Sequence, residues 1–234
     1  MSDHWLYLML DLGAISVPFA CSFYSKANFS STWKSLAPAM IIPAIIFIIW
    51  DILFTEWGFW GFNPKYLTGY KISNLPVEEW LFFFCIPYAC TFTYFSFNHL
   101  FKTNPLKKYE KAISWVLIIV MLIAGFWNLS LAYTSVTFIS LAFFLLGYNV
   151  FIKKSLAYFY LTFIVILVPF FIINGVLTGT GIEGEVVWYN DDENLGIRML
   201  TIPVEDTFYG MLLLIMNITL YDYFRFRNSA DSAG

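Results

Sequence analysis

The sequence predicts an all-α integral membrane protein of about seven transmembrane helices, built as two parallel three-helix repeats joined by a connector helix. Of its 234 residues, 59% are hydrophobic and only 12% are charged, whereas a soluble domain averages about 25% charged residues. Several apolar runs reach the length that a helix needs to cross a bilayer. They are continuously apolar, unlike the alternating strands of a membrane barrel. A motif that recurs 127 residues later indicates the repeat.

The repeated motif is Pro-Val-Glu followed by a second acidic residue, and it opens two of the apolar runs. Each copy puts two carboxylates in the first turn of a helix: Glu78 and Glu79 in one, Glu205 and Asp206 in the other. Pro76 and Pro203 are expected at the first helical position, where the missing N–H costs nothing. Inserting a charged side chain into a membrane-spanning helix costs about 2.5 to 3.5 kcal/mol, so a carboxylate at such a place indicates a functional site.

Further residues match at the same offset of 127, so we interpret the pattern as an internal duplication. The identical or similar pairs include Asn63 and Asn190, Gly69 and Gly196, Lys71 and Arg198, Phe62 and Tyr189, Phe82 and Tyr209, and Tyr94 and Tyr221. We expect a first repeat over 1–104, a connector over 105–130 and a second repeat over 131–234.

The helices follow in order from the apolar runs. We place them at 4–24, 35–54, 76–101, 112–128, 131–148, 155–177 and 203–224. The first run lacks the basic flank and the small-residue cleavage site of a signal peptide, so we expect it to be a retained helix.

Basic residues predict the orientation of these spans. Ten lysines and arginines fall on one side of the membrane and three, Lys65, Lys71 and Arg198, on the other. Positive charge favours the cytoplasmic side. We therefore expect a multi-pass protein of the cell (inner) membrane, with the N-terminus outside and the C-terminus in the cytoplasm. Both acidic helix openings then lie on the outer side and can face one chamber, each beneath a long loop, at 55–75 and 178–202.

Helix geometry limits how the four carboxylates can face. Adjacent helical residues point about 100° apart, so the two acids of one pair cannot face one spot. We favour Glu78 and Glu205 as the inward-facing acids, with Glu79 and Asp206 as their partners, and leave the converse open. An apolar environment raises a carboxyl pKa, whereas a helix N-terminus lowers it. Carboxyl groups in which these two opposing effects are balanced differently can provide one proton donor and one proton acceptor. The structural alternative is a set of capping acids at the water interface.

Other residues support or compete with this interpretation. Asp11 lies within the first run and Asp51 closes the second, with Asn174 in a similar place at the end of the sixth. Trp60 and Trp188 precede the acidic openings, where they fit either an interfacial aromatic belt or a wall against a long apolar ligand.

Three other motifs are set aside. The glycine pattern at 179–184 matches a dinucleotide fingerprint but has no preceding strand. The acidic run at 190–193 suggests a magnesium–diphosphate site, but it lacks a second acidic cluster and basic neighbours. No lysine lies in the middle of a run, as a retinal Schiff base would need. We expect no metal and no cofactor.

With these residues, the sequence resembles the membrane-embedded lycopene cyclases that carry two homologous cyclase domains. These occur as heterodimers in some bacteria and as fused chains in other bacteria, archaea and fungi. The matching signatures are Trp60-Gly-Phe-Asn63 with Gly69, Leu75-Pro-Val-Glu-Glu-Trp80 with Pro87-Tyr88, and Arg198, Thr201-Ile-Pro-Val-Glu-Asp206 and Asn217 through Asp222.

The resemblance implies a redox-neutral lycopene β-cyclase, an intramolecular lyase or isomerase of carotenoid biosynthesis. A carboxylic acid protonates the ψ end of lycopene, the C5=C6 alkene attacks the cation, and a base removes a proton to give a β-ionone ring. By residue, it implies catalytic roles for Glu78, Glu79, Glu205 and Asp206. The resemblance also carries over to Pro76 and Pro203. From the sequence itself we add Asn63, Asn190, Asp11, Asp51 and Tyr209 as supporting residues, and Phe82, Tyr88, Trp60 and Trp188 as residues that line the substrate. The expected partners are lycopene and membrane lipid, without nucleic acid.

Two alternatives stay open. A carotenoid hydratase on the same scaffold would let water capture the cation, whereas a proton-coupled membrane carrier would use the embedded acids without chemistry.

Overall fold

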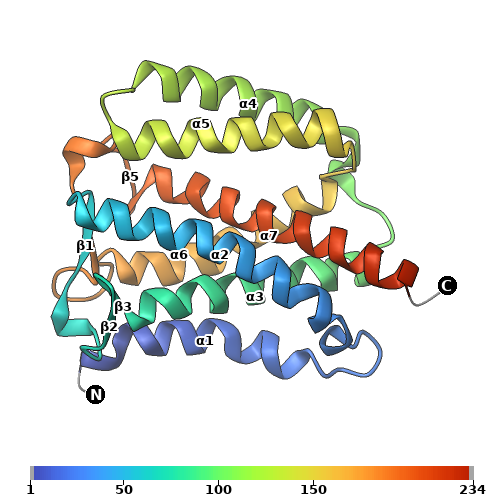
Figure 1. Ribbon diagram of the computed structural model, residues 1–234, viewed down its shortest axis with the longest axis horizontal. Helices are drawn as coiled ribbons and strands as arrows, with labels where there is room; N and C mark the ends of the chain where they lie inside the picture. Colours follow the sequence, from blue (N-terminus) through green and yellow to red (C-terminus); the bar gives the residue numbers. More distant parts are fainter. Residues whose placement is uncertain (1–2, 232–234) are drawn as a thin grey trace.

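Seven α-helices lie side by side and form an elongated bundle, with the chain termini at opposite ends (Figure 1). The computed structural model describes residues 3–231. The helices are α1 (Leu6–Cys21), α2 (Trp33–Glu56), α3 (Val77–Leu100), α4 (Glu110–Trp127), α5 (Ala132–Gly147), α6 (Ala157–Leu177) and α7 (Val204–Asp231). The predicted all-α membrane fold is therefore confirmed, with most boundaries within a few residues of those expected.

Six helices in the described part of the chain, α1 to α6, are long and apolar enough to cross a membrane. The last helix, α7, runs seven residues beyond the predicted end. It carries two acids in its first turn, and Asp222, Arg225 and Arg227 lie in its C-terminal third. It nevertheless packs along α2 and α5 within the bundle. The prediction that Pro76 and Pro203 open the helices is wrong by one residue. Each ends a short strand, and the helix begins at the following valine.

The duplication is visible in the loops at the N-terminal end of the bundle. A hairpin of β2 (Lys71–Ile72) and β3 (Leu75–Pro76) precedes α3, and β5 (Arg198–Met199) with β6 (Ile202–Pro203) precedes α7. Their registers match at the offset of 127, since Lys71 pairs with Pro76 and Arg198 with Pro203. Both hairpins turn through a residue with positive φ. The sequence repeat is thus also a repeat of backbone geometry.

One antiparallel strand pair joins the two repeats directly. β1 (Trp60–Phe62) pairs with β4 (Val187–Tyr189), and Gly61 lies opposite Trp188. These two residues are 127 apart, so the pair is centred on a pseudo-two-fold axis. A Cβ built on Gly61 would lie 2.4 Å from the Trp188 ring. Glycine at this position therefore lets the indole lie across the strand.

The helices of the two repeats interlock. α1 packs on α3 and α5 packs on α7 within each repeat, whereas α2 packs mainly on α7, and α6 on α3, of the other repeat. α4 lies on the outside against α5. The start of α3 and the start of α7 therefore lie at the same end of the bundle (Figure 1).

Candidate functional site: an acidic end on an apolar cavity

A cavity of about 330 Å³ lies inside the bundle and is bounded by residues of both repeats. Its walls come mainly from α1, α3, α6 and α7, and β1 and β4 close the end where the hairpins lie. Along α3 the lining residues run from Glu79 to Thr93, a distance of about 21 Å at 1.5 Å per residue. The cavity is therefore long, and apart from one end its lining is mostly apolar.

Three carboxyl groups lie at this end of the cavity: Asp51, Glu79 and Asp206. None of the described residues that line the cavity is basic. Charge is expensive to hold in such a place without a partner. The neighbours of each carboxyl group therefore decide what it can do.

Glu79 lies among other acids. Its Oε2 accepts a hydrogen bond of 2.6 Å from the Tyr7 hydroxyl of α1. Its carboxyl group also lies against that of Asp51, at the end of α2. Asp51 in turn accepts a hydrogen bond from the indole N–H of Trp60. Two carboxyl groups in contact repel each other when both are ionised, so sharing a proton is the favourable state of such a pair.

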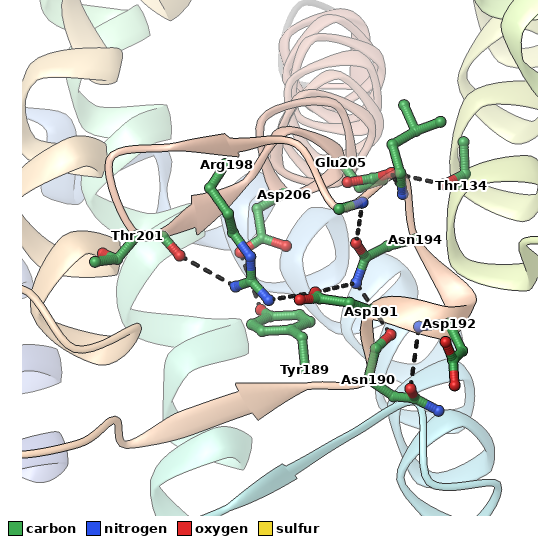
Figure 2. Close-up of polar contacts among 12 residues, drawn as sticks. Thr134, Tyr189, Asn190, Asp191, Asp192, Asn194, Arg198, Thr201, Glu205 and Asp206 are labelled. Carbon is green, nitrogen blue, oxygen red and sulfur yellow. Dashed lines mark hydrogen bonds and ion pairs between the residues drawn. The ribbon is translucent and has the colours of Figure 1, made fainter.

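Asp206 lies among hydrogen-bond donors. Its two oxygens accept bonds from Tyr133 of α5, at 2.6 Å, and from Tyr189 of β4, at 2.9 Å. Arg198 lies over the Tyr189 ring, 5.5 Å from its centroid, and bonds to Thr201 and Asp191 (Figure 2). Burial first, and then the charge of Asp206, raise the pKa of Tyr189 well above its ordinary value. Tyr189 therefore remains a proton-bearing donor at neutral pH.

The preferred orientation of the acid pairs was wrong, and the converse that the sequence left open is the one observed. Glu78 and Glu205 are buried but do not line the cavity. Each instead accepts the backbone N–H of its preceding loop, from Thr68 at 2.7 Å and from Leu195 at 2.9 Å. These two loop residues are again 127 apart. Figure 2 shows Glu205 turned toward Thr134 of α5, whose hydroxyl donates a bond of 2.6 Å.

Aromatic rings surround the three carboxyl groups. Tyr209 of α7 lies close enough to interact electrostatically with Asp51, Glu79 and Asp206. The cavity is also lined by Phe62 and by Trp60 and Phe82, two of the residues expected to lie along the substrate. Ring faces near the acids can stabilise a developing cation.

Two other predicted lining residues lie elsewhere. Tyr88 faces the opposite end of α1, where its hydroxyl bonds to Ser22 at 2.6 Å and its ring packs on Phe29. Trp188 is exposed and lies across Gly61, not along the cavity. Neither residue lines the cavity. Tyr88 lies on a different face of α3 from the lining residues Ile86 and Ala89. Trp188 lies between Val187 and Tyr189, which both line the cavity, and neighbouring side chains of a strand point to opposite faces.

The remaining supporting residues have structural contacts. Asn63 and Asn190 each cap a short turn, accepting the N–H of Lys65 and of Asp192. Asp11 is fully buried where α1 packs against its neighbours, and neither of its oxygens has a hydrogen-bond partner among residues 3–231. It does not line the cavity, but it lies close enough to Glu78 and Glu79 to interact with them.

The two competing loop motifs also take structural roles. At 179–184, a Cβ on Gly179 would lie 2.7 Å from the carbonyl of Gly184, so these glycines permit a tight turn. In the acidic run, Asp191 forms an ion pair with Arg198 at 2.5 Å. Burial acts to raise the pKa of Asp191, but the bonds from Arg198 and Asn194 outweigh it, and the pKa is lowered. No group of three or more possible metal ligands occurs in the described residues 3–231.

Sequence reasoning missed the tyrosines that hold the cavity acids. Tyr7 and Tyr133 bond to Glu79 and Asp206 in the same way, but they are 126 residues apart. An unbroken offset of 127 passes over them, because the tyrosine lies 72 residues before the cavity acid in the first repeat and 73 residues before it in the second. Allowing a one-residue gap in the repeat alignment would have found this pair.

Fold and cavity together define an all-α membrane protein whose two interlocked repeats both place carboxyl groups at the end of a shared apolar cavity, two from the first repeat and one from the second. A family model described as lycopene cyclase matches residues 4–97 and 130–224. The chain therefore belongs to the lycopene cyclase family, an assignment consistent with two fused cyclase-like repeats. The family assigns the chain to carotenoid biosynthesis, as an enzyme that cyclises lycopene. No curated protein and no solved structure matches the chain.

Proposed function

We propose that the chain is a lycopene β-cyclase that uses Glu79 and Asp206 for acid–base catalysis without net redox change. The observation that carries this proposal is that one carboxyl group from each repeat lies at the same end of one apolar cavity. A polyene lying along the cavity brings its terminal double bond to both acids. Positioned acids and bases of this kind contribute about 10²- to 10⁴-fold to rate.

In the proposed reaction, one carboxylic acid gives its proton to the terminal double bond of the ψ end group. The C5=C6 alkene attacks the resulting cation and closes the ring. The other carboxylate then removes one proton and leaves the β-ionone double bond. One proton enters and one leaves, so the mass of the carotenoid is unchanged.

The cavity walls support this chemistry. Trp60, Phe82 and Tyr209 place ring faces around the acids, where they favour a cation. The two strands β1 and β4 close the acidic end, which keeps water from capturing that cation.

Lycopene would enter from the lipid between α1 and α6. Lining residues on this side, such as Pro18 and Leu167, are partly exposed, whereas Leu213 and Leu214 on the α7 side are buried.

Expression in a lycopene-accumulating host, followed by pigment chromatography and mass measurement, tests the function. The expected result is a new carotenoid of unchanged mass whose end groups carry β-ionone rings, absent from cells that hold the Glu79→Gln variant. A product heavier by one water would favour a hydratase. Failure of the purified protein to convert lycopene in detergent, where no ion gradient exists, would favour a carrier and contradict the proposal.

A further inference from the structure

We infer that the two repeats have divided the proton-transfer roles: Glu79 of the first repeat donates the proton, and Asp206 of the second accepts it. In this assignment Asp51 is a positioning residue that keeps a proton on Glu79, and Tyr189 is a positioning residue that keeps Asp206 ionised. The inference rests on the proposed cyclase function.

The surroundings of Glu79 favour the protonated form. The titratable groups near it are Tyr7 and Asp11 of α1, Asp51 of α2, Tyr189 of β4 and Tyr209 of α7. Two of these are acids and none is basic, and only Tyr7 donates a hydrogen bond to Glu79. An acid with acidic neighbours in an apolar site holds its proton. That is the state a donor needs before substrate arrives.

Both carboxyl groups are buried, but the surroundings of Asp206 stabilise the ionised form more than those of Glu79 do. The groups near it are Tyr133 of α5, Tyr189 of β4, Tyr209 of α7, Arg198 of β5 and its own neighbour Glu205. Two hydroxyls donate to its two oxygens, at 2.6 and 2.9 Å, and the Arg198 cation lies above one of them. Hydrogen bonds to a carboxylate and a nearby cation both stabilise its charge. Glu205 opposes this, but it is turned away toward Thr134.

Comparison of equivalent positions shows that the difference is built into the repeats. Where the second repeat has the donor Tyr189, the first has Phe62 at the offset of 127, which cannot donate. In a similar place to Asp51 near the end of α2, the second repeat has the neutral Asn174 near the end of α6. The offset between them is 123, four less than elsewhere, and both line the cavity.

Two further positions differ in the same sense. Thr137 takes the place of Asp11 at the offset of 126 that relates Tyr7 to Tyr133. Lys71, the counterpart of Arg198, is exposed. Each of the four differences either adds an acidic residue to the first repeat or adds a hydrogen-bond donor or a positive charge near the acid of the second.

The proton balance of the reaction closes within this arrangement. Glu79 loses a proton to the substrate carbon, and Asp206 gains one from the cyclised cation. Before the next turnover a proton must return from Asp206 to Glu79. Tyr209 and Tyr189 lie within electrostatic reach of both carboxyl groups and carry exchangeable hydroxyl protons.

Deuterium exchange into unreacted lycopene separates the two roles. In D₂O, the Asp206→Asn variant is expected to protonate lycopene reversibly through Glu79, so recovered lycopene gains deuterium although the product falls at least ~100-fold. The Glu79→Gln variant is expected to give neither product nor exchange. Exchange in Glu79→Gln, or its absence in Asp206→Asn, would overturn the assignment. Wild-type protein that forms no cyclic carotenoid would instead overturn the proposed function.

The positioning residues are tested by the pH profile of kcat, which loss of folded protein alone does not move. Asp51→Asn copies the second repeat and removes an acid beside Glu79, so the alkaline fall of activity is expected at lower pH. Tyr189→Phe copies the first repeat and removes a donor from Asp206, so the acidic rise of activity is expected at higher pH. Shifts in the opposite senses, or unchanged profiles in both variants, would overturn these roles. Tyr88→Phe, far from the acids, is the matched control and is expected to leave the profile unchanged.

Discussion

At the scale of the residue, a carboxyl group in this protein is defined by its neighbours and not by its place in the motif. Glu78 and Glu79 are adjacent, yet one binds a loop N–H and the other faces the cavity. The motif identified both acids correctly as buried polar groups of interest. It could not say which one faces inward, because that depends on the rotation of α3 about its axis. Since α3 is apolar on nearly all sides, its sequence contains no polar face to fix that rotation.

The loop-binding acids are expected to affect folding more than the reaction. Thr134→Val removes the hydroxyl that donates to Glu205 at 2.6 Å, inside a buried site. Leaving a buried acceptor with fewer donors costs about 1–3 kcal/mol. We expect a lower thermal midpoint in detergent, with the turnover of the remaining folded protein within a few-fold of wild type. A large fall in turnover at unchanged stability would show that Glu205, and not Asp206, serves the reaction.

At the scale of the element, the β1–β4 pair holds the two repeats together over the acidic end of the cavity. The helices could be predicted from the sequence because their apolar runs are long. Strands of two or three residues could not, because their pairing partner lies in the other repeat, more than a hundred residues away. The repeat offset of 127, which relates Gly61 to Trp188, was the one feature of the sequence that pointed to this strand pair.

Gly61 tests the close approach at the centre of this pair. A Gly61→Val side chain would meet the Trp188 ring, which lies 2.4 Å from the ideal Cβ. Overpacking of this kind costs about 1–3 kcal/mol, so we expect lower stability in a thermal melt. The double variant Gly61→Val with Trp188→Ala removes the obstacle and is expected to regain much of the loss. Equal stability of the single variant and wild type would contradict the packing.

The loops of the two repeats are also joined by an exposed ion pair, Lys65 with Glu183, at 2.9 Å. The hydrogen bond from Lys65 lowers the pKa of Glu183, and the same contact raises the pKa of Lys65. The lowered acid pKa means that this link is present above the ordinary glutamate pKa and is lost as pH falls through the lowered value. The raised lysine pKa means that it is present below the ordinary lysine pKa and is lost as pH rises through the raised value.

Proteolysis of these loops is therefore expected to quicken in acid below about pH 4.5, the ordinary range of a glutamate. Glu183→Gln is the matched control and should show fast cleavage at every pH. Cleavage of wild-type protein at the same rate at pH 7 and at a pH well below the ordinary glutamate pKa would contradict a role of this pair in holding the loops.

At the scale of the whole molecule, the two repeats interlock so that neither encloses the cavity alone. The duplication and the helix count could be predicted from the sequence. So could the convergence of both acidic openings at one end, because a single connecting helix makes the two three-helix repeats run in the same direction across the membrane. The packing of α2 on α7 and of α6 on α3 could not be predicted from the sequence. These helices are apolar on all sides, so no face of the helix indicates which neighbour it contacts.

The membrane orientation remains a prediction of the basic residues. With ten of the thirteen lysines and arginines near the C-terminal end of the bundle, we expect that end in the cytoplasm. A C-terminal tag should then be protected from protease in sealed right-side-out vesicles and cleaved in inverted ones. Cleavage in the right-side-out vesicles alone would place the acidic end of the cavity on the cytoplasmic side.

The central claim is that two repeats make one catalytic site and not two. Turnover of lycopene by purified Glu79→Gln, Asp206→Asn and the double variant tests it most directly. One shared site predicts that each single variant loses at least about 100-fold and that the double variant is hardly worse than either. If each single variant keeps about half of the wild-type rate, and only the double variant is inactive, each repeat works alone and the shared site is contradicted.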